Sequence, residues 1–145
     1  MVLRQELNKQ IGLFNAIEAL IDQHHPLFKL ANTIDWNVFE NHFKKHYSEK
    51  MGKPAKPIRL MVSVLILKYL RNLSDENLVD YWSENIYFQY FSGEQNFQPK
   101  IPCVATELIA FRHRIGEEGM ELVLKESIRI NKGDNSDSEG ELLLV

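Results

Sequence analysis

The chain has 145 residues, which suits one domain with extended ends better than two full domains. Apolar residues make up 44% and charged residues 26%, ordinary values for a globular protein that buries a core. The formal net charge of −3 excludes a polycation that binds nucleic acid through its overall charge alone.

The first predicted element is an amphipathic helix over residues 3–21. Its apolar residues recur at steps of three or four, which places them on one face. They are Leu3, Leu7, Ile11, Phe14, Ile17 and Ile21. This face fits either packing against the rest of the chain or pairing with a second subunit. The sequence His24-His25-Pro26 ends the pattern, because a residue before proline avoids the helical conformation.

Two further helices and a basic loop follow. A short helix is predicted through Leu27 and Leu30, and Asp35 is the expected N-cap of a helix that runs from Trp36 to Tyr47. Residues 52–57 hold one glycine and two prolines and are predicted to form a loop. Between residues 42 and 59 there are six Lys and Arg residues and a single acid, so this part of the chain is locally basic.

The apolar run from 58 to 70 is predicted to be a central helix that is buried nearly all round. Its β-branched residues make a buried strand the alternative, but the run is longer than most strands and contains no turn signal. It is also too short to span a bilayer and includes Arg59 and Lys68. With a charged N-terminus and a single cysteine, Cys103, these features predict a cytoplasmic protein without an intramolecular disulfide.

The second half of the chain is predicted to be helical as well. Ser74 is the expected N-cap of a helix, a short helix covers residues 86–91, and residues 95–102 form a loop. A helix then begins near Thr106 and ends at Gly116, and a last helix covers residues 117–130. Residues 131–145 are polar and acidic and are predicted to be disordered. The prediction is therefore an all-α domain over residues 1–130 with a tail.

Two clusters are interpreted as structural. The aromatic residues between 81 and 97 are predicted to pack in the core rather than to stack on bases, since their surroundings are acidic. His42 and His46 have the spacing of two zinc ligands on a helix, but Phe43 occupies the position where the metalloprotease motif needs Glu. No metal site is predicted. Cys103 is expected to be a small buried residue.

Several short motifs point to a known family when they are taken in order. They are His25-Pro26-Leu27, Ile34-Asp35-Trp36, Pro57-Ile58-Arg59-Leu60-Met61-Val62, Leu73-Ser74-Asp75-Glu76, Tyr90-Phe91-Ser92-Gly93-Glu94, Pro102-Cys103 and Phe111-Arg112-His113-Arg114-Ile115-Gly116-Glu117. In this order they resemble the N-terminal domain of InsH-like transposases, the insertion-sequence-five group. The resemblance covers about residues 25–130.

The resemblance implies a helical domain that binds the double-stranded DNA of terminal inverted repeats. In full-length relatives an RNase H-like domain follows, and its DDE carboxylates hold the two metal ions that cleave and join strands. The fifteen residues after Ile130 show no strand pattern, so we expect a truncated, non-catalytic protein without cofactors. Its expected partners are DNA and, as a homodimer or heterodimer, a second copy or the full-length transposase.

The expected DNA contacts lie in two places. On a helix over residues 106–115, Leu108, Phe111 and Ile115 would point inward, and the opposite face would point outward. The helix that begins at Ser74 would pair with this one, although the connection between them is too long for a tight helix-turn-helix. Lysines of the basic loop suit phosphate neutralisation. The candidate DNA-binding residues are Lys53, Lys56, Arg59, Lys100, Thr106, Arg112, His113 and Arg114.

Three functional hypotheses remain open at this stage. The leading one is a DNA-binding domain that occupies the ends of the element, either in transposition or in its inhibition. The second is a protein that dimerises with intact transposase without touching DNA. The third is an independent enzyme, which only the number of carboxylates favours, since no spacing of catalytic residues supports it.

Overall fold

The computed structural model describes residues 16–46 and 56–134, and in this part of the chain every regular element is a helix. The predicted all-α class is confirmed. The elements are α2 (Ile17–Leu20), α3 (Pro26–Thr33), α4 (Trp36–Phe43), the 3-10 turn η1 (Lys44–His46), α5 (Ile58–Arg71), α6 (Asp75–Trp82), α7 (Ile86–Phe91) and α8 (Ala105–Asp134).

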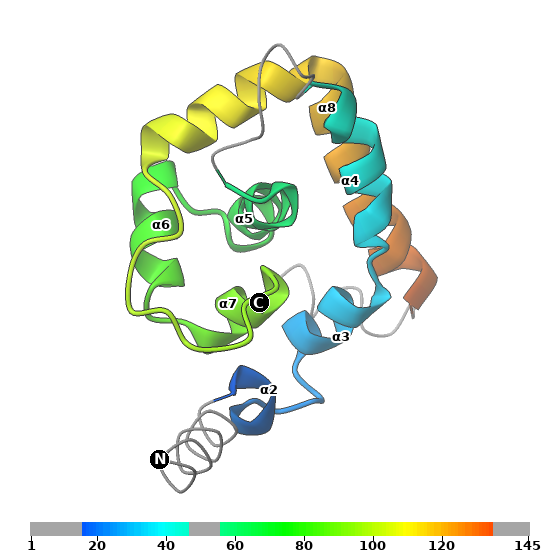
Figure 1. Cartoon of the computed structure of the whole chain (residues 1–145). Coiled ribbons are helices and arrows are strands. Elements are labelled where there is room, and N and C mark those ends of the chain that lie inside the picture. Colours follow the sequence, from blue (N-terminus) through cyan, green and yellow to red (C-terminus); the bar gives the residue numbers. More distant parts are fainter. Residues whose placement is uncertain (1–15, 47–55, 135–145) are drawn as a thin grey trace, which may run out of the picture.

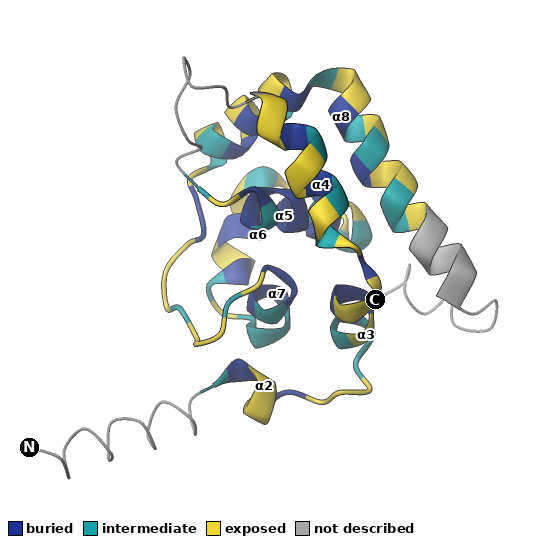
Figure 2. Cartoon of the chain, turned by 45° about the vertical axis from the view of Figure 1, so that its right-hand side comes forward, coloured by how far each residue is buried: buried dark blue, intermediate teal, exposed yellow. Residues whose placement is uncertain are grey.

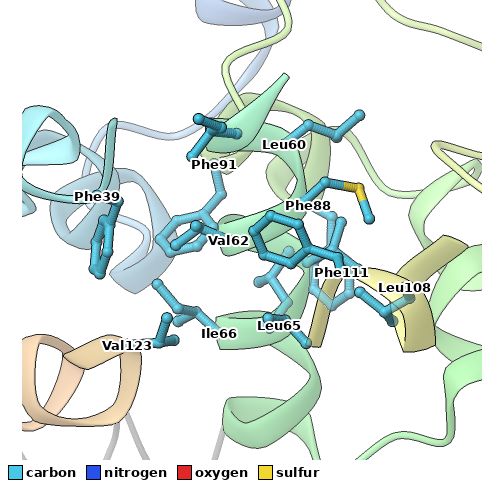
Figure 3. Packing of buried hydrophobic residues seen from close by; sticks show 14 of the residues in the cluster. Phe39, Leu60, Val62, Leu65, Ile66, Phe88, Phe91, Leu108, Phe111 and Val123 are labelled. Carbon is cyan, nitrogen blue, oxygen red and sulfur yellow. The ribbon is translucent and has the colours of Figure 1, made fainter. Parts of the chain in front are cut away.

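Helix α5 is the centre of the fold; α3, α4, α6, α7 and α8 surround it, and α2 lies outside this ring (Figure 1). Nine of its first ten residues are buried, on all sides of the helix, and the exception is Arg59. Figure 3 shows side chains from the surrounding helices converging on Val62, Leu65 and Ile66 of α5. Each fully buried aliphatic side chain of this kind stabilises the fold by about 1.5–3 kcal/mol. The prediction of a central helix, rather than a strand, is confirmed.

Side-chain caps determine where several helices begin. The carboxylate of Asp35 accepts a hydrogen bond from the N–H of Asn37 at 3.1 Å, and the hydroxyl of Ser74 accepts one from Asn77 at 3.2 Å. Both were predicted as N-caps. Asn85 caps α7 in the same way. Each cap of this type contributes about 1 kcal/mol, because it pairs a backbone donor that the helix itself leaves free.

A small polar network lies inside the core beside α5. The indole N–H of Trp82 donates to the Ser92 hydroxyl at 2.9 Å, and the Ser63 hydroxyl lies 2.6 Å from the same oxygen. All three side chains are almost completely buried. Because the polar atoms satisfy one another, this network fixes the end of α7 against α5 without leaving unpaired groups.

Helix α8 bends at Gly116, where the backbone has φ 68° and ψ −173°. Figure 1 shows the two parts running in different directions, one yellow and one orange. We call residues 105–115 the first arm and residues 117–134 the second arm. The conformation of Gly116 is one that residues with a Cβ essentially never adopt. The regular helical conformation therefore ends at Gly116, as predicted, and a second helical segment follows it.

Two predicted boundaries were wrong. The backbone of Ala16 is extended and bridges to Asn96, and the N–H of Ile17 bonds to the carbonyl of Gln95 at 3.0 Å. The predicted continuous helix over residues 3–21 is thus interrupted at Ala16. The N–H of Ile17 bonds to the distant residue Gln95 and not to a carbonyl one helical turn before it. The second arm also continues to Asp134, four residues past the predicted end of the last helix at residue 130. Residues 1–15 and 135–145 of those predictions lie outside the described part.

Candidate nucleic-acid interface

The first arm of α8 has one buried face and one exposed face, as the sequence predicted. Leu108, Phe111 and Ile115 are at most 4% exposed and pack into the core. The exposed face carries Thr106, Ala110, His113 and Arg114. Ile109 belongs to the same outward side and is 47% exposed. Sequence reasoning passed over Ile109, although its position one turn from His113 and Thr106 gave the signal.

The start of the first arm is held by buried residues and by one hydrogen bond from a side chain. Pro102 and Cys103 are buried just before it. The carboxylate of Glu107 accepts the N–H of Val104 at 3.0 Å. This is the acidic half of a capping box, in which the third helical residue reaches back to the cap. Burial raises the pKa of the Cys103 thiol to about 11, so Cys103 is a packing residue, as predicted.

An ion-pair cluster fixes the first arm to the rest of the body. The guanidinium of Arg112 donates two parallel hydrogen bonds to the carboxylate of Asp75 on α6, at 3.0 and 2.8 Å. The ammonium of Lys68 on α5 lies 3.1 Å from the same carboxylate. The hydrogen bonds from Arg112, then those from Lys68, lower the pKa of Asp75 to about 2, against the effect of its burial. Three helices therefore meet at one carboxylate.

This cluster changes the interpretation of Arg112. Its side chain is only 25% exposed, and Asp75 occupies the bidentate edge that would otherwise pair with a guanine. The guanidinium would have to leave Asp75 before it could read a base. A contact between Arg112 and DNA stays a prediction, and in the structure its side chain positions the first arm.

Arg59 is also held by the protein. Its guanidinium lies over the ring of Trp36, 4.6 Å from the centroid, and one terminal nitrogen is 3.5 Å from the carbonyl of Phe91. Its Nε is buried without a hydrogen-bond partner, and burial lowers its pKa. Gly93 makes room for it: a Cβ there would lie 3.1 Å from Nε, and Gly93 also has a φ of 93°. Arg59 thus joins α5 to α4 and to the end of α7.

The predicted lysines are distributed around the start of the first arm. Lys56 lies close enough to the Cys103 thiol to lower its pKa, in opposition to burial. The end of the basic loop therefore reaches the beginning of the first arm. Lys100 is exposed in the loop that precedes that arm. Lys53 lies outside the described residues. The structure thus brings Lys56 near Cys103, at the beginning of the first arm.

The helix pair suggested by the sequence forms, but not as a tight helix-turn-helix. Helix α6 packs against α8, and the Asp75–Arg112 ion pair joins them. Helix α7 and a loop separate the two in sequence. This agrees with the expectation that the connection is too long for the tight motif.

The aromatic residues between 81 and 97, predicted to pack in the core, divide into buried and exposed members. Trp82, Phe88 and Phe91 are at most 1% exposed, as core packing requires, whereas Tyr81 and Phe97 are 45% and 40% exposed.

Within residues 16–46 and 56–134, no three His, Cys, Asp or Glu side chains are grouped as metal ligands. Every helix in this same part is too short or too polar to cross a lipid bilayer.

These features describe a helical domain built around one buried helix, with a long bent helix that exposes part of its first arm. The family model described as Transposase domain (DUF772) matches residues 15–114. The match covers more than half of the chain, and the chain belongs to this family of transposase domains. The resemblance found in the motifs is thereby confirmed.

One similar curated protein is "Uncharacterized protein ORF8 in nfe locus" from Rhizobium meliloti, 39% identical over 112 residues. The aligned region is 77% of this chain and 54% of the relative, so the chain spans about half the length of the protein it matches. No solved structure matches significantly. The family supports a transposase-related role, and the matched range ends at the last residue of the exposed face of the first arm.

Proposed function

We propose that this domain binds duplex DNA at the terminal inverted repeats of an insertion element, through the exposed face of the first arm. The observation that carries the proposal is the geometry of that arm in a transposase-family domain. Its inner face is anchored by Leu108 and Phe111, its flank is fixed by the Arg112–Asp75 ion pair, and its outer face is exposed. A helix held rigidly along one side can enter a major groove with the other.

The side chains of this face suit two kinds of contact. Arg114 and His113 can reach base edges, because both carry hydrogen-bond donors at the end of a side chain on the exposed face. Thr106, in the first helical turn, and the nearby Lys56 and Lys100 suit phosphate oxygens. The basic loop would then position the domain and the first arm would read sequence. This division requires only local positive charge, which agrees with a net charge of −3 for the whole chain.

In the proposed role the domain holds element ends and does not itself cleave DNA. Strand cleavage by this class of enzyme requires carboxylates that hold two metal ions. Asp75, the most strongly perturbed carboxylate in the described part, is instead engaged by Arg112 and Lys68. The domain would therefore contribute to transposition by recognising DNA, or inhibit it by occupying the ends.

The rival function is association with intact transposase without DNA contact. The observation that favours it is the set of exposed apolar residues on α8, among them Leu124 and Ile128, at 38% and 53% exposure. The two functions differ in a simple way, since only the first requires affinity of the isolated chain for DNA.

The test is a fluorescence-anisotropy titration of the full chain. The probes are a duplex carrying the terminal repeat that flanks its own gene and a scrambled duplex of the same composition, each at about 50 and 200 mM salt. We expect tighter binding to the repeat and weaker binding at the higher salt concentration. No binding to either duplex at low salt would refute the DNA function and leave the rival.

Two matched substitutions localise the contact. Arg114→Ala should weaken binding to the repeat by about 1–3 kcal/mol and reduce the preference over scrambled DNA. Lys29→Ala removes a positive charge from an exposed site on α3, which lies at the opposite end of the body from the first arm (Figure 1), and should leave both affinities unchanged. Equal losses in the two variants would show that the first arm is not the binding surface.

A further inference from the structure

Helix α8 carries an apolar strip on its outside that the described part of the chain does not cover. Met120, Leu124 and Ile128 follow one another at steps of four along the second arm, beside the stripe that includes the buried Val123. Leu124 is 38% and Ile128 53% exposed. Figure 2 shows this arm at the edge of the body, with exposed and partly buried residues along it.

The strip extends beyond the second arm on both sides. At one end, a hollow of about 120 Å³ lies between α8 and Tyr69 and Leu70 of α5, and Leu124 and Ile128 line it. At the other end, an open hollow inside the bend at Gly116 runs from Leu124 to Ile109 on the first arm. Leu124 belongs to both hollows. Tyr69 and Ile109 are 48% and 47% exposed, so exposed apolar side chains flank Leu124 on both sides. The hollow at the bend is lined as well by Arg112, His113, Glu117 and Glu121.

The charges beside the strip are arranged for pairing with an identical helix in the opposite direction. Glu121 and Lys125 are both exposed and lie one turn apart on the same edge of the strip. When two copies pack antiparallel about a twofold axis near Leu124, each edge meets the same edge of the other copy. Glu121 of one copy then lies beside Lys125 of the other, and this pairing occurs twice.

The apolar residues match under the same operation. Leu124 meets Leu124 across the axis, and Met120 meets Ile128. A parallel arrangement, about a twofold axis along the helices, would turn the edges that carry Glu121 and Lys125 to opposite sides of the interface, so these two pairs would not form. We propose that the domain forms a homodimer in which the second arms of α8 pack antiparallel around Leu124, with Tyr69 and Ile109 at the two ends of the interface.

The dimer leaves Thr106, Ala110 and Arg114 of the proposed DNA-binding face available. On the first arm, Ile109 and His113 line the hollow beside the strip, whereas Thr106, Ala110 and Arg114 lie progressively further round the helix. The centre of the dimer interface therefore lies on the second arm, and the residues left for DNA lie on the first. The dimer does not depend on the proposed DNA binding, and the two are tested separately, because self-association is measured without DNA.

The test is sedimentation equilibrium of the full 145-residue chain, from about 1 to 200 μM and in the absence of DNA. The mass should rise with concentration from 17.0 kDa toward twice that value. Leu124→Glu places a charge at the centre of the interface and should raise the dimer dissociation constant on the order of 30-fold or more. The matched control is Leu20→Glu on α2, at a site that is 57% exposed and outside the strip, and it should leave the constant unchanged.

A charge exchange tests the antiparallel direction. Glu121→Lys alone should weaken the dimer roughly three- to tenfold, and adding Lys125→Glu in the same chain should restore it, because the pairs re-form with reversed signs. Far-UV circular dichroism of every variant shows that the helices are retained. A chain that stays monomeric at all concentrations overturns the proposal, and so does a dimer that Leu124→Glu leaves intact. Failure of the double exchange to restore affinity overturns the antiparallel arrangement.

Discussion

Replacing Asp75 with asparagine removes the carboxylate at which α5, α6 and the first arm of α8 meet. The amide keeps the size of the side chain but cannot neutralise Lys68 and Arg112, whose charged groups both contact it. The Asp75 side chain is only 14% exposed, so solvent screens this site weakly. We therefore expect a clear loss of stability at neutral pH.

The magnitude follows from the pKa of Asp75. Folding lowers this pKa from 3.8 to about 2, which corresponds to about 2–3 kcal/mol of stability at pH 7. Because the folded pKa lies below the unfolded one, the contribution is fully present above about pH 5 and is lost as pH falls through 3.8 toward 2. About half of it should remain at pH 3, and little at pH 2.

The assay is urea unfolding of wild type and Asp75→Asn at pH 7, 5, 4 and 3, followed by tryptophan fluorescence. The difference in unfolding free energy should be about 2–3 kcal/mol at pH 7 and should shrink steadily below pH 5. Asp80→Asn, at an exposed site on the same helix, is the control and should change stability by less than about 0.5 kcal/mol. Equal effects of the two substitutions, or a difference that does not change with pH, would refute the reasoning.

Three other predictions concern the core and the bend. Ser92→Ala leaves the buried indole N–H of Trp82 without its acceptor, so urea unfolding should show a loss of about 1–3 kcal/mol, and a loss below 0.5 kcal/mol would contradict the network. Gly116→Ala should cost about 1–3 kcal/mol in thermal unfolding, although a Cβ there has no atom within 4 Å, because the backbone conformation alone resists it. The Cys103 thiol, whose pKa burial raises to about 11, should react with a disulfide reagent at pH 8 only after unfolding, and rapid reaction of the native chain would contradict its burial.

The helices were predictable because their signals are local. The apolar run of α5, the caps Asp35 and Ser74 and the glycine at 116 each act within a few residues of their own position. The break at Ala16 was not predictable in this way. The apolar spacing continues through it, and the bond that replaces the helical one comes from Gln95, far along the chain.

The candidate site was predictable in its outline but not in its charges. Helical periodicity placed Thr106, His113 and Arg114 on the outside of the first arm, and the structure agrees. The ion pair of Arg112 with Asp75 joins residues 37 positions apart, and nothing local distinguishes it. The presence of an acidic residue at position 75 is explained locally, since a carboxylate in the first turn stabilises a helix, so nothing in the sequence pointed to a distant partner. Long-range ion pairs therefore escape sequence reasoning even where every helix around them is correctly predicted.

The bend at Gly116 makes one backbone position the joint between two surfaces. The side chains that face DNA in the proposed complex lie on the first arm of α8, and the centre of the proposed dimer interface, around Leu124, lies beyond this residue on the second arm. In a symmetric pair, the angle at the joint would set how far apart the two first arms stand and how each is oriented. A change in that angle alone would alter the spacing between the two DNA sites that a dimer contacts. The side chains of both surfaces would stay the same.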